Sequence, residues 1–147
     1  MEEELYLISH ITLITGLSDR TIRNYIASGI LKGEKINGIW HFTPEEVDAF
    51  IKNPAVRPSI VAKNNSVVYD FMLNDSKKEE ETCVILDLPK CDIKETAEFF
   101  CYGISNGDYK DINFSFDGNY KTPRIILRGK PSDVFGLIGD YYKSSRS

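Results

Sequence analysis

Two arginines and an asparagine lie close together at helical spacing near the start of this 147-residue chain. Arg20, Arg23 and Asn24 occupy positions i, i+3 and i+4, so a helix over residues 18–28 would place them side by side. An arginine can pair with guanine through two hydrogen bonds, and an asparagine can pair with adenine in the same way. This polar face therefore has the donors and acceptors needed to read bases in a major groove, although an ordinary solvated helix face has the same composition. The opposite face is apolar and consists of Ile22, Tyr25 and Ile26.

Residue patterns typical of enzymes are absent from the sequence. It contains no glycine-rich phosphate loop, no Gly-x-Ser-x-Gly turn, no His-Glu-x-x-His helix and only two histidines. Asp87, Asp92 and Glu95 form an acidic group, but Asp92 is better explained as the N-cap of a helix. We therefore predict that the protein is not an enzyme and needs no cofactor or metal. The cysteines lack the pair spacing of a zinc site and are expected to be reduced core thiols: Cys83, Cys91 and Cys101.

Clear helix and turn signals position the polar face in the N-terminal third of the chain. A short helix over residues 9–15 should end at Gly16, and Ser18 is placed to cap the next helix. Asn37-Gly38 predicts a type I′ hairpin, the core of a β-wing over residues 31–42. Thr43-Pro44-Glu45-Glu46 has the pattern of a capping box and predicts a third helix. That helix should bury Val47, Phe50 and Ile51.

The remainder of the chain alternates short apolar runs with amphipathic segments. Strands are predicted at Val67–Leu73, Thr82–Leu88, Ile112–Asp117 and Arg124–Arg128. Two helices are predicted, one with Ile93, Ala97, Phe100, Cys101 and Ile104 on a stripe, the other with Val134, Leu137, Ile138 and Tyr141. The fold class that buries both stripes most simply is α+β, with helices over an antiparallel sheet in a ferredoxin-like sandwich. Pro54 and Pro58 mark a boundary, so we predict a domain over residues 1–53, a linker over 54–66 and a second domain over 67–147.

Three segments within residues 5–52 together resemble the winged helix-turn-helix domain of the MerR family. Residues 21–31, Thr-Ile-Arg-Asn-Tyr-Ile-Ala-Ser-Gly-Ile-Leu, resemble its recognition helix and exit, and Asn37-Gly38-Ile39-Trp40-His41-Phe42 resembles its wing. Thr43-Pro44-Glu45-Glu46-Val47 resembles the start of the following helix. The resemblance implies sequence-specific binding of double-stranded DNA and transcriptional regulation. Trp40 stands where the family usually has an arginine, and Asn24 replaces an aromatic residue. The candidate DNA-binding residues are Ser18, Arg20, Thr21, Arg23, Asn24, Tyr25, Lys32, Lys35, Asn37 and His41.

Charge and domain order indicate that one copy alone would bind DNA weakly. The net charge is −4, and residues 1–63 hold seven Lys and Arg against eight Asp and Glu. MerR relatives dimerise through a long helix after the DNA-binding domain, whereas here prolines and predicted strands follow. We therefore expect a homodimer formed by the second domain. The candidate dimer or partner residues are Phe99, Tyr102, Phe135, Gly139 and Tyr142, although the same positions could simply be buried on wide helix faces.

Two other functions fit the sequence. A ligand-sensing regulator would use the tyrosines of the second half to line an aromatic pocket, namely Tyr69, Tyr102, Tyr109, Tyr120, Tyr141 and Tyr142. Alternatively, the chain is a phage excisionase-like or adaptor protein whose C-terminal domain binds a protein partner. No apolar run approaches the roughly 20 residues that cross a bilayer, and the acidic start Met1-Glu2-Glu3-Glu4 differs from a signal peptide. We therefore expect a cytoplasmic protein with no membrane partner.

Overall fold

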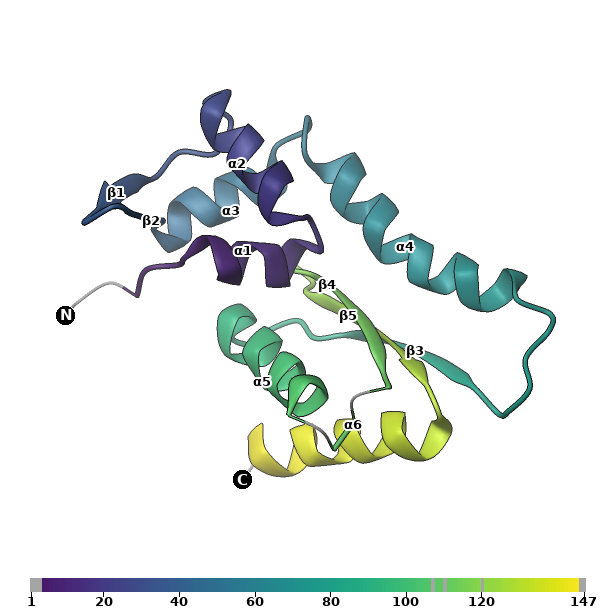
Figure 1. Ribbon diagram of the computed structural model, residues 1–147. Coiled ribbons are helices and arrows are strands. Elements are labelled where there is room, and N and C mark those ends of the chain that lie inside the picture. Colours follow the sequence, from purple (N-terminus) through teal and green to yellow (C-terminus); the bar gives the residue numbers. More distant parts are fainter. Residues whose placement is uncertain (1–3, 107, 110, 120, 146–147) are drawn as a thin grey trace.

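The computed structural model describes residues 4–106, 108–109, 111–119 and 121–145. Its elements are α1 (Ile8–Thr15), α2 (Asp19–Ala27), β1 (Glu34–Ile36), β2 (Ile39–His41), α3 (Pro44–Lys52), α4 (Arg57–Leu73), β3 (Thr82–Asp87), α5 (Ile93–Ser105), β4 (Asn113–Asp117), β5 (Arg124–Gly129) and α6 (Pro131–Ser145) (Figure 1). The predicted α+β class is confirmed.

The N-terminal elements form for the local reasons that the sequence suggested. Gly16 ends α1 with a φ of 76°, and the Ser18 hydroxyl accepts a hydrogen bond from the Thr21 N–H at 3.1 Å at the start of α2. The capping box of α3 is complete, because Thr43 N–H donates to Glu46 and Glu46 N–H donates back to the Thr43 hydroxyl. These caps fix where the helices begin and end.

The hairpin between α2 and α3 is tied to the N-terminal segment. Asn37 and Gly38 have φ values of 52° and 80°, so the predicted type I′ geometry is present. Tyr6 and Phe42 then exchange two backbone hydrogen bonds of 2.7 and 2.9 Å, which the sequence did not reveal. The segment before α1 thus anchors the base of the hairpin.

The strand predicted at Val67–Leu73 is wrong, because these residues lie in the long helix α4. Residues 57–66 of the predicted linker are also helical, so a turn over residues 53–56 joins α3 to α4. Pro58 lies in the first turn of α4, where a missing N–H costs little. We expected strands after the N-terminal unit, where MerR relatives have a long helix. This expectation is wrong, because α4 follows there. The stripe that faces the sheet is hard to recognise because it includes a polar residue: Ile60, Asn64, Val67 and Phe71.

The second half is built on a three-stranded antiparallel sheet in the order β3-β5-β4, which among the described residues is one strand fewer than predicted. Helices α5 and α6 cover one face, and α4 crosses the other face over β4 and β5 (Figure 1). The Asp92 carboxylate caps α5 by accepting from the Glu95 N–H at 2.9 Å, as predicted. The predicted apolar stripes point inward, with Ala97 and Phe100 of α5 and Val134 and Leu137 of α6 buried.

One continuous core joins the two halves of the chain. Helix α1 lies between the N-terminal helices and the sheet, and the carbonyl oxygen of Ile14 accepts a hydrogen bond from the Gly118 N–H at 2.7 Å. Buried residues from Ile8 to Tyr141 form a single hydrophobic cluster. The two parts thus pack against each other, and the turn over residues 53–56 joins α3 to α4. Within the described ranges, no helix has the length and apolar character needed to cross a membrane.

Candidate nucleic-acid interface

Helix α2 lies on the outer side of the N-terminal unit and keeps its polar edge open (Figure 1). Arg20, Arg23 and Asn24 are all exposed, whereas Ile22 on the opposite side is fully buried. The main contacts of α2 are with α1, and it is α1 that packs on α5 and β4. The second half of the chain therefore leaves this edge accessible.

Arg23 has a local partner at this edge. Its Nε atom lies 2.7 Å from Oδ1 of Asp19, one helical turn earlier, and both side chains are about three-fifths exposed. Exposed pairs of this kind contribute roughly 0.2–1 kcal/mol, less than the roughly 1–3 kcal/mol of a good bidentate contact with a base. A base can therefore compete for Arg23. Within the described ranges, Arg20 has no ion pair.

Tyr25 differs from its neighbours on the predicted surface. Its ring meets that of Phe50 edge to face, with 5.3 Å between the centroids, and the side chain is half-buried. Tyr25 is thus a packing residue between α2 and α3. Thr21 is also partly covered, and its hydroxyl accepts a hydrogen bond from the Ser18 hydroxyl. Ser18 itself is exposed at the helix start.

The hairpin places a second group of predicted residues in solvent. Lys32, Lys35 and Asn37 are exposed, and the Lys35 ammonium lies 5.9 Å from the centre of the Trp40 ring. Trp40 is partly buried and its ring stacks on that of Phe42. His41 is partly buried, and its Nδ1 atom lies 2.9 Å from the carbonyl oxygen of Ile39. The hairpin therefore offers two lysines and an amide to a ligand.

Gly33, at the entrance to the hairpin, allows a close packing contact that the local sequence does not indicate. A Cβ atom there would lie 2.4 Å from the ring of Phe42 and 2.8 Å from the carbonyl oxygen of His41. The glycine therefore lets the chain pass directly over the buried phenylalanine.

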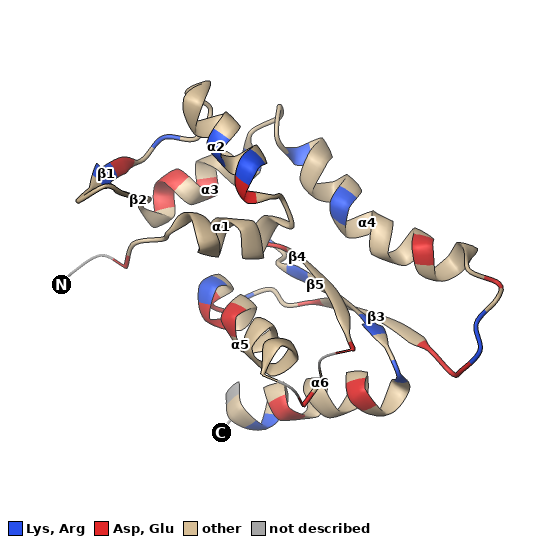
Figure 2. Cartoon of the chain, viewed as in Figure 1, with Lys and Arg blue, Asp and Glu red and all other residues tan. Residues whose placement is uncertain are grey.

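Figure 2 shows how charge is distributed over this side of the molecule, with Lys and Arg on α2, beside the hairpin and in the first part of α4.

The five predicted dimer residues do not form one exposed surface. Tyr102 and Phe135 are 70% and 59% exposed, and a Cβ atom added at Gly139 would meet nothing within 4 Å. In contrast, Phe99 and Tyr142 both pack edge to face on Tyr141, with centroid distances of 5.6 and 5.2 Å. For these two side chains, the alternative of burial on a wide helix face describes the structure better.

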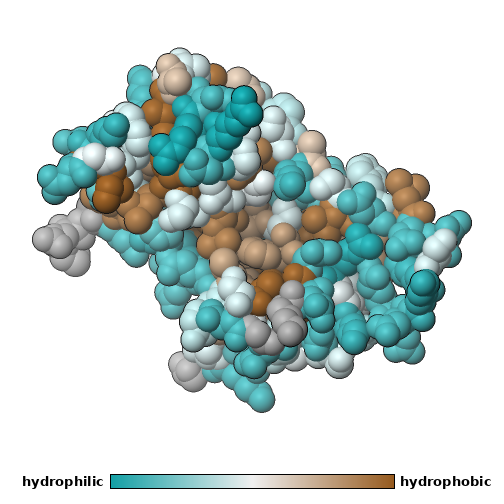
Figure 3. Space-filling view, viewed as in Figure 1, coloured by the Kyte–Doolittle hydropathy of each residue, from teal (hydrophilic) through white to brown (hydrophobic). Residues whose placement is uncertain are grey.

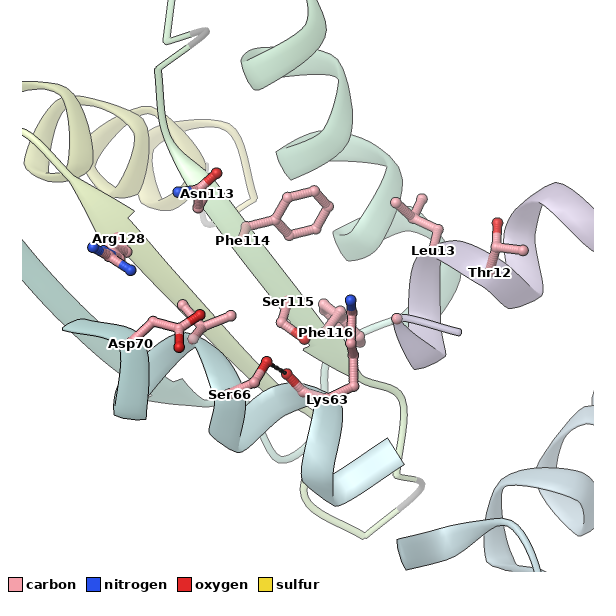
Figure 4. Close-up of a pocket in the computed structure, with 12 residues that line it drawn as sticks. Thr12, Leu13, Lys63, Ser66, Asp70, Asn113, Phe114, Ser115, Phe116 and Arg128 are labelled. Atoms are coloured by element: carbon pink, nitrogen blue, oxygen red, sulfur yellow. Dashed lines mark hydrogen bonds between the residues drawn. The ribbon is translucent and has the colours of Figure 1, made fainter. Parts of the chain in front are cut away.

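A groove of about 530 Å³ lies between α1, α4 and β4, where the two halves of the chain meet. Phe114 and Phe116 of β4 contribute to its lining, and Figure 3 shows apolar side chains, in brown, gathered in the middle of this face of the molecule. Lys63 and Ser66 of α4 flank the groove, and Ser115 lies opposite them on β4 (Figure 4). The Ser115 hydroxyl is buried and has no hydrogen-bond partner among the described residues. The sequence could not reveal this groove because its walls come from distant segments.

A second cavity, of about 790 Å³, lies between the start of α5 and the end of α6. Phe99, Tyr141 and Tyr142 line one side, and the acidic group of Asp87, Asp92 and Glu95 contributes to the lining. Two of the six tyrosines predicted for an aromatic pocket are therefore found here. Of the others, Tyr69 and Tyr102 are exposed, Tyr109 donates a hydrogen bond to Asp140, and Tyr120 lies outside the described residues.

The cysteines are less buried than predicted. Cys83, Cys91 and Cys101 are free thiols of intermediate exposure, and of the three only Cys91 packs against the described hydrophobic core, so the expectation of core thiols is wrong for Cys83 and Cys101. Partial burial raises the pKa of the Cys83 and Cys91 thiols. Across the described residues, no group of His, Cys, Asp and Glu side chains is arranged to hold a metal ion.

Comparison of the chain with family models, curated proteins and solved structures finds no match.

Proposed function

We propose that this protein binds double-stranded DNA as a transcriptional regulator of the winged helix-turn-helix type, with α2 as the recognition helix and the β1–β2 hairpin as the wing. The observation that carries the proposal is the open polar edge of α2, formed by Arg20, Arg23 and Asn24 beside an exposed hairpin. The resemblance of residues 21–31 and 37–47 to the MerR family supports the same function.

The shape of α2 suits entry into a major groove. Its contacting edge ends in Ala27 and Ser28, two small exposed residues that allow close approach to a helix of DNA. Arg20 and Arg23 supply guanidinium forks for guanine or phosphate, and Asn24 supplies a carboxamide for adenine. Lys32 and Lys35 would meet the backbone at the flank of the site, which is the part that a wing usually contacts.

The acidic chain makes a particular prediction about affinity. Most non-specific affinity for DNA comes from phosphate neutralisation, and only a few cations lie on α2 and the hairpin. One copy should therefore bind weakly and with strong salt dependence. Two copies related by a two-fold axis would double the footprint, so we propose that a homodimer is the binding form.

Selection of bound duplexes from random DNA at moderate salt tests the proposal. The wild-type protein should enrich a short motif, and Arg23→Ala should relax the preference at one position at a cost of about 1–3 kcal/mol. Arg20→Ala should act at a neighbouring position or, if it contacts phosphate, weaken all sequences alike. Lys78→Ala, in the exposed loop between α4 and β3, is the matched control and should change neither affinity nor motif. Recovery of random sequences by the wild-type protein would contradict the proposal.

The cavity of about 790 Å³ between α5 and α6 favours one addition to this function, the binding of a small effector molecule. Phe99 and the tyrosines beside it offer ring faces, and Asp92 and Glu95 offer carboxylates, so the cavity suits a ligand with an aromatic or cationic group. A thermal-shift screen of aromatic amines tests this idea. A hit should lose its effect in Phe99→Ala and keep it in Tyr69→Ala, since Tyr69 is exposed on α4.

A further inference from the structure

Strand β3 forms an edge of the sheet, and its outer side has free hydrogen-bonding groups. Leu88 N–H donates to the Pro123 carbonyl at 2.7 Å, so in the antiparallel register the even-numbered residues of β3 face β5. Cys83, Ile85 and Asp87 therefore direct their N–H and C=O groups away from the sheet. No backbone group of the described residues pairs with them.

Apart from the charged Asp87 at its end, this edge lacks the features that usually protect an edge strand. Residues 82–87 contain no proline, no lysine and no bulge. The Ile85 side chain is 50% exposed, and Val84 and Leu86 on the other face are only partly buried. In the central strand β5, residues 125–127 are at most 1% exposed. An open apolar edge of this kind is a template for another strand.

We propose that β3 pairs with β3 of a second copy of this chain, antiparallel and about a two-fold axis at Ile85. In this register Ile85 lies opposite the partner's Ile85, and Val84 lies opposite the partner's Leu86. Both pairs are apolar, and the symmetry repeats the second pair on the other side of the axis. The three outward-facing residues of each copy form about six hydrogen bonds in all.

Charge and proline positions select this register over its neighbours. An axis at Val84 would place Glu81 opposite the partner's Asp87, and like charges directly opposite are unfavourable. An axis at Leu86 would bring Pro89, which has no N–H, to a hydrogen-bonding position opposite the partner's Cys83. In the register centred on Ile85 no like charges lie opposite each other, and Pro89 lies opposite the partner's Glu81, outside β3, so that Cys83, Ile85 and Asp87 all keep a partner that has an N–H. The edge is therefore complementary to a second copy of itself in this register.

The pairing would join the two three-stranded sheets into one continuous sheet. Helix α2 lies at the far side of the molecule from β3 (Figure 1), so the interface leaves the polar edge of α2 uncovered. The proposed DNA-binding function explains what such a dimer would be for, because it would supply two recognition helices. The inference rests on that function in this respect alone. Its test does not involve DNA, so the two can fail separately.

Disulfide trapping tests the register directly. In a background in which the three native cysteines are serine, Ile85→Cys should form a covalent dimer on mild oxidation. Residues opposite each other in a hydrogen-bonded pair have Cα atoms about 5.5 Å apart, within the range that a disulfide spans. Ile39→Cys is the matched control, because Ile39 is 56% exposed on the hairpin and should stay monomeric on the gel. Equal cross-linking of both variants, or none at position 85, would overturn the proposal.

Light scattering gives a second readout that does not depend on a new cysteine. The wild-type protein should be a dimer at high micromolar concentration, and Ile85→Lys should be a monomer with an unchanged far-UV circular dichroism spectrum. Val61→Lys, at a 40% exposed position on α4, should remain a dimer. A monomeric wild-type protein, or a dimer that survives Ile85→Lys, would contradict this interface whatever the outcome of the DNA experiments.

Discussion

The guanidinium group of Arg57 meets the carboxylate of Asp117 through two hydrogen bonds of 2.9 and 2.7 Å. The pair joins the start of α4 to the end of β4, and Asp117 is only 7% exposed. The Asp117 carboxylate also accepts a hydrogen bond from the Asn119 N–H. This contact fixes the angle at which α4 leaves the N-terminal unit and crosses the sheet.

Loss of this ion pair should destabilise the whole chain, since both halves share one core. We expect Asp117→Ala to lower the free energy of unfolding by about 1.5–3 kcal/mol, the range for hydrogen bonds to charged groups. The control is Asp87→Ala, which breaks a pair with Arg124 in which both side chains are more than two-fifths exposed. That variant should cost only about 0.2–1 kcal/mol. Urea denaturation of both variants checks the difference, and equal losses would contradict it.

Much of the N-terminal unit was predictable because its signals are local. The Ser18 cap, the Thr43 capping box and the Asn37-Gly38 turn each involve residues within three positions of one another. These interactions depend little on the rest of the fold, so the sequence indicated them directly. The exposure of Arg20, Arg23 and Asn24 followed from the same helical periodicity.

The remaining features depend on contacts between distant residues and were not predictable. The β-branched and aromatic run Val67–Leu73 favours a strand locally, but packing over β4 and β5 makes it the end of a helix. The Tyr6–Phe42 bridge, the Arg57–Asp117 pair and the groove beside Ser115 all join segments more than 30 residues apart. Helical periodicity placed Phe99 and Tyr142 outside the core stripes, but the position of Tyr141 between them decides their packing.

His10 should make stability depend on pH. Its Nδ1 atom accepts a hydrogen bond from the Leu7 N–H at the start of α1, and burial, with a smaller contribution from Lys94, lowers the pKa of the imidazole below 6.5. The unfolded chain therefore takes up a proton at a higher pH than the folded chain does. Stability from this group should be complete above pH 6.5 and decrease as the pH falls below that value.

Urea denaturation between pH 7.5 and pH 5 measures this effect. His10→Gln should be less stable at neutral pH but should show a weaker decrease on acidification than the wild-type protein, because the titrating group is gone. An identical pH dependence in His10→Gln and wild type would show that another group is responsible.

Gly33→Ala should damage the hairpin that we assign as the wing. The new methyl group would overlap the buried ring of Phe42, and overpacking of this kind costs about 1–3 kcal/mol. Gly139→Ala is the matched control, since nothing lies within 4 Å of its added Cβ in the middle of α6. That change should be neutral or stabilising by about 0.5–1 kcal/mol. Thermal unfolding of the two variants compares them.

Asp19→Asn should strengthen DNA binding. The Asp19 carboxylate holds Arg23 at 2.7 Å and adds a negative charge beside the proposed DNA surface. Its removal frees the arginine and lessens repulsion of phosphates, so affinity should increase several-fold at low salt. A small loss of stability, about 0.3–1 kcal/mol, should accompany the change because the carboxylate favours the start of α2. Unchanged or weaker binding would mean that Arg23 does not contact DNA.

The most direct measurement of the central claim is duplex affinity as a function of salt concentration. Fluorescence anisotropy with labelled random-sequence DNA should show binding at low ionic strength, and the logarithm of the affinity should fall linearly with the logarithm of the salt concentration. Arg20→Ala combined with Arg23→Ala should abolish most of this binding, whereas Lys78→Ala should preserve it. Absence of duplex binding by the wild-type protein at low ionic strength, or full binding by the double variant, would contradict the account.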